Sequence, residues 1–348
     1  MTLTEAAILV RKVGFWVVVL IVLVIFLRIL IGAGAGVFRH FYPKPTPAPA
    51  VAFGKLKNYD FSQDKVEKSD GVTFAIKTIE GGLPNLGNQA KVFKVIASAP
   101  SILFGEQARE KARKLGFSAQ PQILSDRLYV FSDPGIPRRL EIDVISGNFV
   151  IINEVSSYPE LLEMAGRLDK ADAIRIAESF LSQLNIKQLE FSKDRTIVTP
   201  LKIEGGNLVV ANSLADAQIV RVSYSRTDLE EKPILPLDSD KQNVWVEVTS
   251  LREPAKQVFQ ASYSYYPVDL ANSSTYPIKP TETAFEELKS GTGVIIGKKS
   301  PEMNIRRVFL AYLETKAPMD FFTPVYVFAG DEAVGIVEAI PVEWFTPQ

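Results

Sequence analysis

The chain has 348 residues, 47% of them hydrophobic, with 39 basic and 40 acidic side chains. That length is enough for about two domains with cores of their own, and the near-neutral charge excludes the basic footprint of a nucleic-acid-binding protein. The absence of cysteine excludes disulfides, thiol nucleophiles and zinc–thiolate sites, and a single histidine, His40, excludes a multi-histidine metal centre.

The first apolar segment, residues 13 to 31, predicts a membrane-spanning helix. As an α-helix it is about 28 Å long, enough to cross the hydrocarbon core of a bilayer. Its one charge, Arg28, lies near its end, where a long side chain can reach the lipid headgroups. We therefore predict a single-pass cell-membrane protein, anchored in the lipid bilayer through Val13 to Ile31, with a cytoplasmic N-terminus and the bulk of the chain extracytoplasmic. The alternatives are a buried helix of a soluble domain and a signal peptide cleaved near Ala33-Gly34-Ala35.

A proline-rich stretch, FYPKPTPAPA, occupies residues 41 to 50. Its prolines, Pro43, Pro45, Pro47 and Pro49, alternate with other residues. Such alternation favours extended polyproline II at about 3.1 Å per residue. We expect residues 41–52 to form a stiff tether between the anchor, residues 1–40, and the folded region.

The first folded module is expected over residues 53–156. Residues 105–117 have the spacing of a short amphipathic helix, with Gly116 as its left-handed cap and Phe117 as the contact beyond it. Residues 138–155 read as two strands around the turn Ser146-Gly147-Asn148, which is a hairpin signal.

A second region, residues 157–348, is expected to hold two more modules, 157–270 and 271–348. A helix begins at Asp169, which can cap it, and apolar residues recur at helical spacing after that. Strands are predicted at 195–204, 218–226, 243–250 and 257–266. In the last, an aromatic face that includes Phe259 and Tyr263 faces either the core or a stacked glycan or peptide, with the core reading preferred.

In the last module we predict a helix from Thr281 to Lys289. Strands are predicted near 293–297, 304–313, 324–329 and 332–340. Leu310 lies in a strand that is apolar on both faces and should be central, while Pro324 cannot donate to a ladder and should begin its strand. The fold class predicted is α+β: one N-terminal transmembrane helix, then tandem modules of a short helix packed on antiparallel sheet.

A resemblance to known families rests on several segments. The hairpin IDVISGNF resembles the closing hairpin of PepSY-type domains, whose Asp-x-x-[Thr/Ser]-Gly turn is matched by Asp143, Ser146 and Gly147. The segments QIVRVSYSRTDLEEKPIL, YPIKPTETAFEELKSGTG and NIRRVFLAYLETKAP, with FTPVYVF, resemble the YycH/YycI family. That resemblance implies a single-span protein whose outer domain regulates a sensor kinase in the membrane.

One enzyme reading needs weighing, because three strings match the elements of a penicillin-binding site. They are Ser62-Gln63-Asp64-Lys65, Ser146-Gly147-Asn148 and Lys289-Ser290-Gly291. The nucleophile should open a buried helix, where desolvation lowers the pKa of the lysine. Ser62 instead lies in a charged stretch, the second string is a hairpin turn, and the third follows a helix rather than forming a strand.

No other motif carries chemistry. Asp238-Ser239-Asp240 does not open a calcium loop, because Asn243 stands where the glycine belongs and Thr249 where the terminal glutamate belongs. We therefore predict no catalytic, cofactor-binding or metal residues and no nucleic-acid partner. The function predicted is a membrane-anchored extracytoplasmic binding or regulatory module without catalytic activity, whose partner is another membrane or envelope protein. The alternatives are an envelope enzyme with a Ser/Lys or carboxylate site and a structural subunit of an envelope complex.

Overall fold

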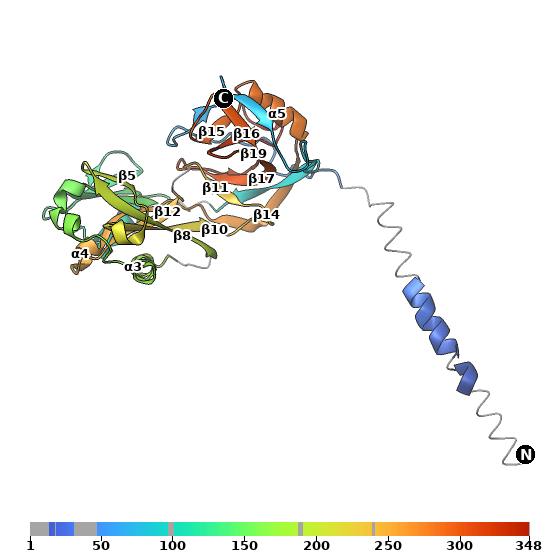
Figure 1. The fold of residues 1–348 in the computed structure, drawn as a ribbon, viewed down its shortest axis with the longest axis horizontal. Helices are drawn as coiled ribbons and strands as arrows, with labels where there is room; N and C mark the ends of the chain where they lie inside the picture. The colour runs from blue at the N-terminus through green and yellow to red at the C-terminus, as the bar shows by residue number, and fades with distance from the viewer. Residues whose placement is uncertain are drawn as a thin grey trace, which may run out of the picture. The chain divides into compact units, whose positions relative to one another are not determined.

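The computed structural model of the protein describes residues 14–17, 19–30, 47–96, 101–186, 191–238 and 241–347. Contacts divide the chain into two compact units, Met1–Ala48 and Pro49–Gln348. Each unit is described by itself. Figure 1 shows the helical residues of the first unit in blue, and the strands and the other helices in the second.

In the first unit the described helical residues are 14–17 and 19–30, and their large apolar side chains are exposed. Within the described part of the chain, no helix is long and apolar enough to span a membrane. This finding contradicts the predicted transmembrane anchor and the single-pass, extracytoplasmic localisation built on it. Val13, Val18, Ile31 and His40 lie outside the described residues.

The largest sheet of the second unit has nine antiparallel strands in the order β4-β5-β6-β7-β13-β12-β10-β8-β9. Its strands are β4 (Gln122–Ile123), β5 (Leu128–Ser132), β6 (Arg138–Asp143), β7 (Phe149–Asn153), β8 (Phe191–Glu204), β9 (Asn207–Val210), β10 (Ile219–Arg226), β12 (Val244–Thr249) and β13 (Val258–Tyr263). Two helices, α2 (Phe104–Lys114) and α3 (Lys170–Gln183), pack on one face of this sheet. They bury Ala108, Ala112, Ala173 and Ala177 in one core with the inward residues of the strands. Figure 1 shows α3 against this sheet, where it packs on β10, β12 and β13.

Alternation along the strands decides which face is covered. In β10, Val220 and Val222 belong to the core under the helices, so Arg221 between them lies on the opposite face. The helices start and stop as their sequences predict. The Asp169 carboxylate accepts the backbone N–H of Asp172 at 2.8 Å, and Gly116, at φ +82°, ends α2 in the left-handed conformation.

Three smaller sheets make up the rest of the second unit. A six-stranded sheet has the order β1-β15-β20-β19-β17-β11, a three-stranded one β14-β3-β18, and a two-stranded one β16-β2. These strands are β1 (Glu67–Lys68), β2 (Thr73–Ile76), β3 (Gln89–Val95), β11 (Ile234–Pro236), β14 (Val268–Pro277), β15 (Val294–Gly297), β16 (Glu302–Ile305), β17 (Arg307–Glu314), β18 (Phe321–Phe322), β19 (Pro324–Ala329) and β20 (Ala333–Glu338). Two pairs, β11–β17 and β16–β2, are parallel.

The remaining helices are short. Helix α5 (Thr281–Lys289) packs Phe285 and Leu288 on the six-stranded sheet. Single turns are α4 (Pro254–Gln257), η1 (Val155–Ser157), η2 (Pro159–Glu163), η4 (Leu214–Asp216) and η5 (Val342–Trp344). The predicted bounds of α5 are confirmed, although its N-cap is Pro280 and no side chain caps it.

The predicted fold class is wrong in its organisation. The second unit is mostly β-sheet with few helices, and its strands pair across the predicted modules rather than within them. β3, near residue 90, pairs with β14, and β7 pairs with β13 across the expected boundary at 156/157. Local periodicity predicts element types, whereas pairing between distant strands depends on packing that it does not encode. The chain is therefore not a row of tandem modules.

The strand that contains Leu310 is two-sided, as predicted. Leu310 packs in the cluster that holds α5, while Ala311 and Leu313 pack with Val325 on the other face. β17 has a neighbour on each side, β19 and β11, and Pro324 is the first residue of β19.

The nine-stranded and six-stranded sheets meet at a buried ion pair. Arg226 of β10 donates to Glu314 of β17, both side chains being less than a tenth exposed. Tyr266 donates its backbone N–H to the same carboxylate at 3.1 Å, and Asn243 donates its side-chain amide to the Glu314 carbonyl at 2.8 Å. Burial raises the pKa of Glu314, and Arg226 opposes that rise. These contacts fix the two sheets to each other within the second unit.

Candidate functional site

The largest hollow described lies on the face of the nine-stranded sheet opposite α2 and α3. Its volume is about 1040 Å³. The strands β8, β10, β12 and β13 supply the floor, the β8–β9 hairpin forms one wall, and the segment of η1 and η2 forms the other. We call this hollow the groove.

A row of polar residues crosses the floor of the groove from strand to strand. Thr199 of β8 is paired with Arg221 of β10, and Arg221 with Glu247 of β12. Glu247 in turn is paired with Gln260 of β13, whose side-chain amide donates to the backbone carbonyl of Asn153 at 2.7 Å. All of them line the groove. Polar residues in register on neighbouring strands fall on one line because their side chains share a face.

The centre of this row is a buried ion pair. Arg221 Nε donates a hydrogen bond to Glu247 Oε1 at 2.9 Å, and Arg221 Nη2 forms an ion pair with the same oxygen at 2.8 Å. Burial raises the pKa of Glu247, and the Arg221 guanidinium acts against that rise. Both donors go to one oxygen, so the other, Oε2, has no hydrogen-bond partner among the described residues. A buried carboxylate oxygen left unpaired is costly, by about 1–3 kcal/mol or more.

Asn153 of β7 is a second buried side chain with an oxygen that lacks a hydrogen-bond partner among the described residues. Its side-chain amide donates to the backbone carbonyl of Phe259. The unpartnered oxygen is its Oδ1. Asn153 shares the β7 face of Phe149 and Ile151, which belong to the core under α2 and α3. Its backbone carbonyl meets the groove floor through Gln260, whereas the fully buried Glu247 side chain lies on the groove face itself.

A second cation lies at the groove beside the ion pair. The Lys241 ammonium sits 4.7 Å from the centre of the Trp245 ring, a geometry in which the ring quadrupole attracts the charge. Burial lowers the pKa of Lys241, and the nearby Arg221 lowers it further. The same Trp245 ring lies 5.7 Å from the Arg221 guanidinium.

The walls of the groove are aliphatic. Ile203, Leu208 and Val210 come from the β8–β9 hairpin, and Val155 and Leu162 from the opposite wall. Val210 is 64% exposed and Leu162 is 58% exposed. Large apolar side chains gathered at the rim of a concave polar floor are typical of a binding surface.

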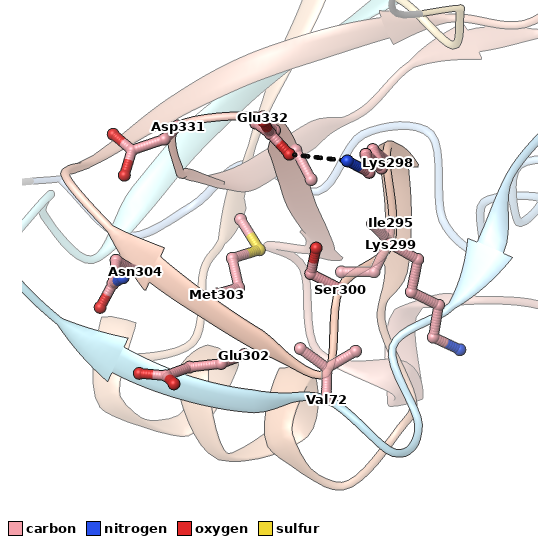
Figure 2. A pocket seen from close by; sticks show the side chains of 11 residues that line it. Val72, Ile295, Lys298, Lys299, Ser300, Glu302, Met303, Asn304, Asp331 and Glu332 are labelled. Atoms are coloured by element: carbon pink, nitrogen blue, oxygen red, sulfur yellow. Dashed lines mark ion pairs between the residues drawn. The ribbon is translucent and has the colours of Figure 1, made fainter.

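A smaller hollow of about 290 Å³ lies between β16 and the β19–β20 turn. Figure 2 shows Lys298 reaching toward Glu332 at 3.5 Å and the Met303 thioether pointing into the space. Lys299 pairs with Asp70 at 3.1 Å. These charges are mostly exposed and paired with each other, which is the ordinary state of a solvated surface.

The structure does not gather the Ser/Lys strings into one site. Ser146 lies in the β6–β7 turn and lines a hollow of about 550 Å³ beside Asp143. Lys289 lies on α5, where its ammonium pairs with Glu286 at 2.9 Å. Neither Ser62 nor Lys289 lines the hollow of Ser146. The Asp143-Ser146-Gly147 turn forms as the hairpin signal predicts, with Gly147 at φ +74°.

Metal chemistry has no counterpart in the described residues, which contain no group of three acidic or histidine side chains placed to hold an ion. Asp238 is described, whereas Ser239 and Asp240 lie outside the described residues. Sequence reasoning located the strands of the groove but missed Arg221, Glu247 and Asn153. The available signal for Arg221 and Glu247 was a charged residue directly between two valines of a strand, in IVRVSYSR and again in VWVEVT.

Comparisons with known proteins do not identify the chain. No family model and no curated protein matches it. Among solved structures, the crystal structure of an uncharacterized protein from Eubacterium rectale ATCC 33656 aligns at a TM-score of 0.34 and 13% identity, over 80% of this chain and 92% of that chain. A likeness this low carries no argument about function. The comparisons add no support to the YycH/YycI resemblance.

Proposed function

We propose that the protein is a binding or regulatory module without catalytic activity and that the groove is its ligand-binding surface. The observation that carries the proposal is Glu247, a fully buried carboxylate on the groove floor with one oxygen unpartnered among the described residues. Buried polar groups in folded proteins are almost always hydrogen-bonded, so an exception calls for a ligand or an ordered water.

The surroundings of Glu247 support binding rather than chemistry. Arg221 is held by a hydrogen bond and an ion pair to the carboxylate, and the Lys241 ammonium lies over the Trp245 ring. The aliphatic walls and the polar floor match the usual composition of a ligand site, in which apolar contacts supply affinity and a few polar groups supply orientation.

Protein-observed NMR on the full chain tests this proposal. The probes are N-methylacetamide, isopropanol and acetate, each titrated separately. We expect shifts at Thr199, Arg221, Glu247 and Gln260 for at least one of them. Shifts that map instead to the hollow of Figure 2, or no saturable shift at the groove, would overturn the proposal.

A matched pair of variants makes the mapping specific. Leu162 at the groove rim is 58% exposed, and Leu124 in the turn between β4 and β5 is 56% exposed. Replacing either with aspartate therefore disturbs the core little. Leu162→Asp is expected to weaken the fragment shifts and Leu124→Asp to leave them unchanged. Equal effects of the two would mean that the fragments bind wherever apolar surface is exposed.

A further inference from the structure

We infer that a second ligand site lies at the end of strand β20, and that its ligand is a small primary alkylamine bound as the ammonium ion. This inference goes beyond the proposed function and does not rest on the groove. The site is a hollow of about 410 Å³ beside the six-stranded sheet, a volume at the small end of the range for small-molecule sites. We call it the β20 hollow, and its lining includes Phe61, Val294, Leu313, Ile336, Glu338 and Val342.

The register of the sheet opens the hollow. The pairing of β15 with β20 ends at Val294 and Ile336, whereas β20 continues to Glu338 with β19 alone beside it among the described strands. Ile336 packs in one apolar cluster with Val325. Glu338 lies opposite Val325 and, two residues after Ile336, on the same face of the sheet. The strand therefore carries a carboxylate to the boundary between an apolar core and the hollow.

The walls around this carboxylate are mostly aliphatic. Val294, Leu313 and Ile336 line the hollow and belong to the same apolar cluster. Ile340 and Val342 also line it, and Val342 is 81% exposed, so it lies at the mouth. Removing a hydrocarbon chain from water against such walls is favourable. The walls therefore select a ligand with an aliphatic part.

Charge decides the head group of the ligand. The described lining contains two acidic side chains and one basic one, Glu287, Glu338 and Lys279. The Lys279 ammonium lies 2.6 Å from Glu287 Oε2, so these two charges compensate each other. Glu338 forms no ion pair within the part of the chain that the structure describes, and its partner is a backbone hydrogen bond at Tyr59. The ionised hollow thus has one uncompensated negative charge, which attracts a cation and repels an anion.

A primary ammonium fits this carboxylate better than a neutral head group does. A hydrogen bond between an ammonium and a carboxylate is about twice as strong as one between neutral groups. A primary ammonium has three N–H donors on one end of its chain, as in lysine, whereas a hydroxyl has one donor and no charge. A primary alkylamine therefore supplies the cationic head and the aliphatic tail in one small molecule.

Binding should be linked to the ionisation of Glu338. Burial raises the pKa of Glu338 to about 7, the Tyr59 backbone and Lys279 oppose that rise, and Glu287 adds to it. The Tyr59 hydroxyl also interacts with this carboxylate, but burial raises its own pKa, so it stays neutral near pH 7. Glu338 is ionised in about one molecule in eleven at pH 6 and in about ten in eleven at pH 8, so the apparent affinity for a cation should rise about tenfold. The alkylammonium stays charged over this interval, because its pKa is close to the value of about 10.4 for lysine.

Titration of the full chain with n-butylamine, followed by NMR of the methyl groups of Val294, Leu313 and Ile336, tests the inference. We expect saturable shifts and an apparent Kd about tenfold lower at pH 8 than at pH 6. The matched ligand control is n-butanol, which keeps the chain without the charge and should bind more weakly at pH 8. In Glu338→Gln the dependence on pH should vanish, and the affinity at pH 8 should fall to that of the parent at pH 6 or lower.

A pair of surface variants locates the binding. Val342→Lys adds a cation at the mouth and should weaken the binding of butylammonium. Leu270→Lys changes a residue of β14 that is 68% exposed and does not line the hollow, so it should leave the affinity unchanged. Equal weakening by both variants would mean that overall charge, rather than the hollow, attracts the ammonium, and would overturn the inference.

Three other results would overturn it as well. They are equal affinity for n-butylamine and n-butanol, an affinity for n-butylamine that is the same at pH 6 and pH 8, and the absence of saturable shifts at the three methyl-bearing residues. Each of them leaves the proposed function standing, because the groove is on another sheet and its fragments are followed at residues of that sheet.

Discussion

A buried carboxylate on β20 should make the stability of the protein depend on pH. Glu338 lies opposite Val325 of β19 and lines a hollow of about 410 Å³ with Phe61 and Leu313. Burial raises the pKa of Glu338 to about 7, with a backbone hydrogen bond at Tyr59 and the charge of Lys279 holding it down. Replacing this residue, Glu338→Gln, removes the titration and keeps the shape.

The sign of the effect follows from the direction of the shift. A carboxyl that holds its proton more tightly when folded stabilises the protein fully below its unfolded pKa, near 4.5, and loses that stabilisation as the pH rises through about 7. A shift of about 2.5 units corresponds to about 3 kcal/mol, as an order of magnitude. The stability of Glu338→Gln relative to the parent should therefore rise by up to that amount between pH 4.5 and pH 8.

Urea unfolding at pH 5, 6, 7 and 8 measures this difference. The exposed Glu302→Gln serves as the control for the loss of one negative charge. A difference between parent and Glu338→Gln that stays constant across the series would refute the reasoning. It would mean that water reaches the Glu338 carboxylate in the folded state.

Three further predictions concern the core and the joint between the sheets. Leu310→Ala should destabilise the protein by about 2–5 kcal/mol in urea unfolding, and parent-like stability would mean that β17 is peripheral. Glu314→Ala leaves Arg226 buried without its carboxylate and should lower the free energy of unfolding by about 3–5 kcal/mol. The Arg226→Met, Glu314→Leu double variant should recover much of that loss, and thermal unfolding compares both variants with the parent. Gly116→Ala places a side chain at φ +82° and should cost about 1–2 kcal/mol by chemical denaturation, a result that an unchanged midpoint would contradict.

Local signals in the sequence predicted many elements of the second unit. Asp169 marks the start of α3, Pro324 starts β19, and Gly116 ends α2, because each signal acts on a few neighbouring residues. The helix over 281–289 formed for the same reason.

Pairing and register could not be predicted in the same way. About half of the chain lies between β3 and β14, and nothing local connects their sequences. The polar row depends on register across β10, β12 and β13, where an irregularity between Glu247 and Val248 shifts the pairing. A shift of one residue would move Glu247 to the opposite face. The groove was therefore hidden from sequence reasoning, although its strands were not.

The predicted anchor failed for a different reason. The apolarity of residues 13–31, together with their length of about 28 Å as an α-helix, predicted a membrane span. The described part of the chain contains no helix that is both long and apolar enough to be one.

The central claim is that the groove binds a ligand at the unpartnered Glu247 Oε2. The most direct test is a crystal structure of the full chain soaked with N-methylacetamide, in a crystal form in which the groove faces solvent. We predict ligand density over β12 and β13, with the amide nitrogen within about 3 Å of Glu247 Oε2. Amide bound only elsewhere, or a groove that holds nothing but water hydrogen-bonded to Glu247, would contradict the account.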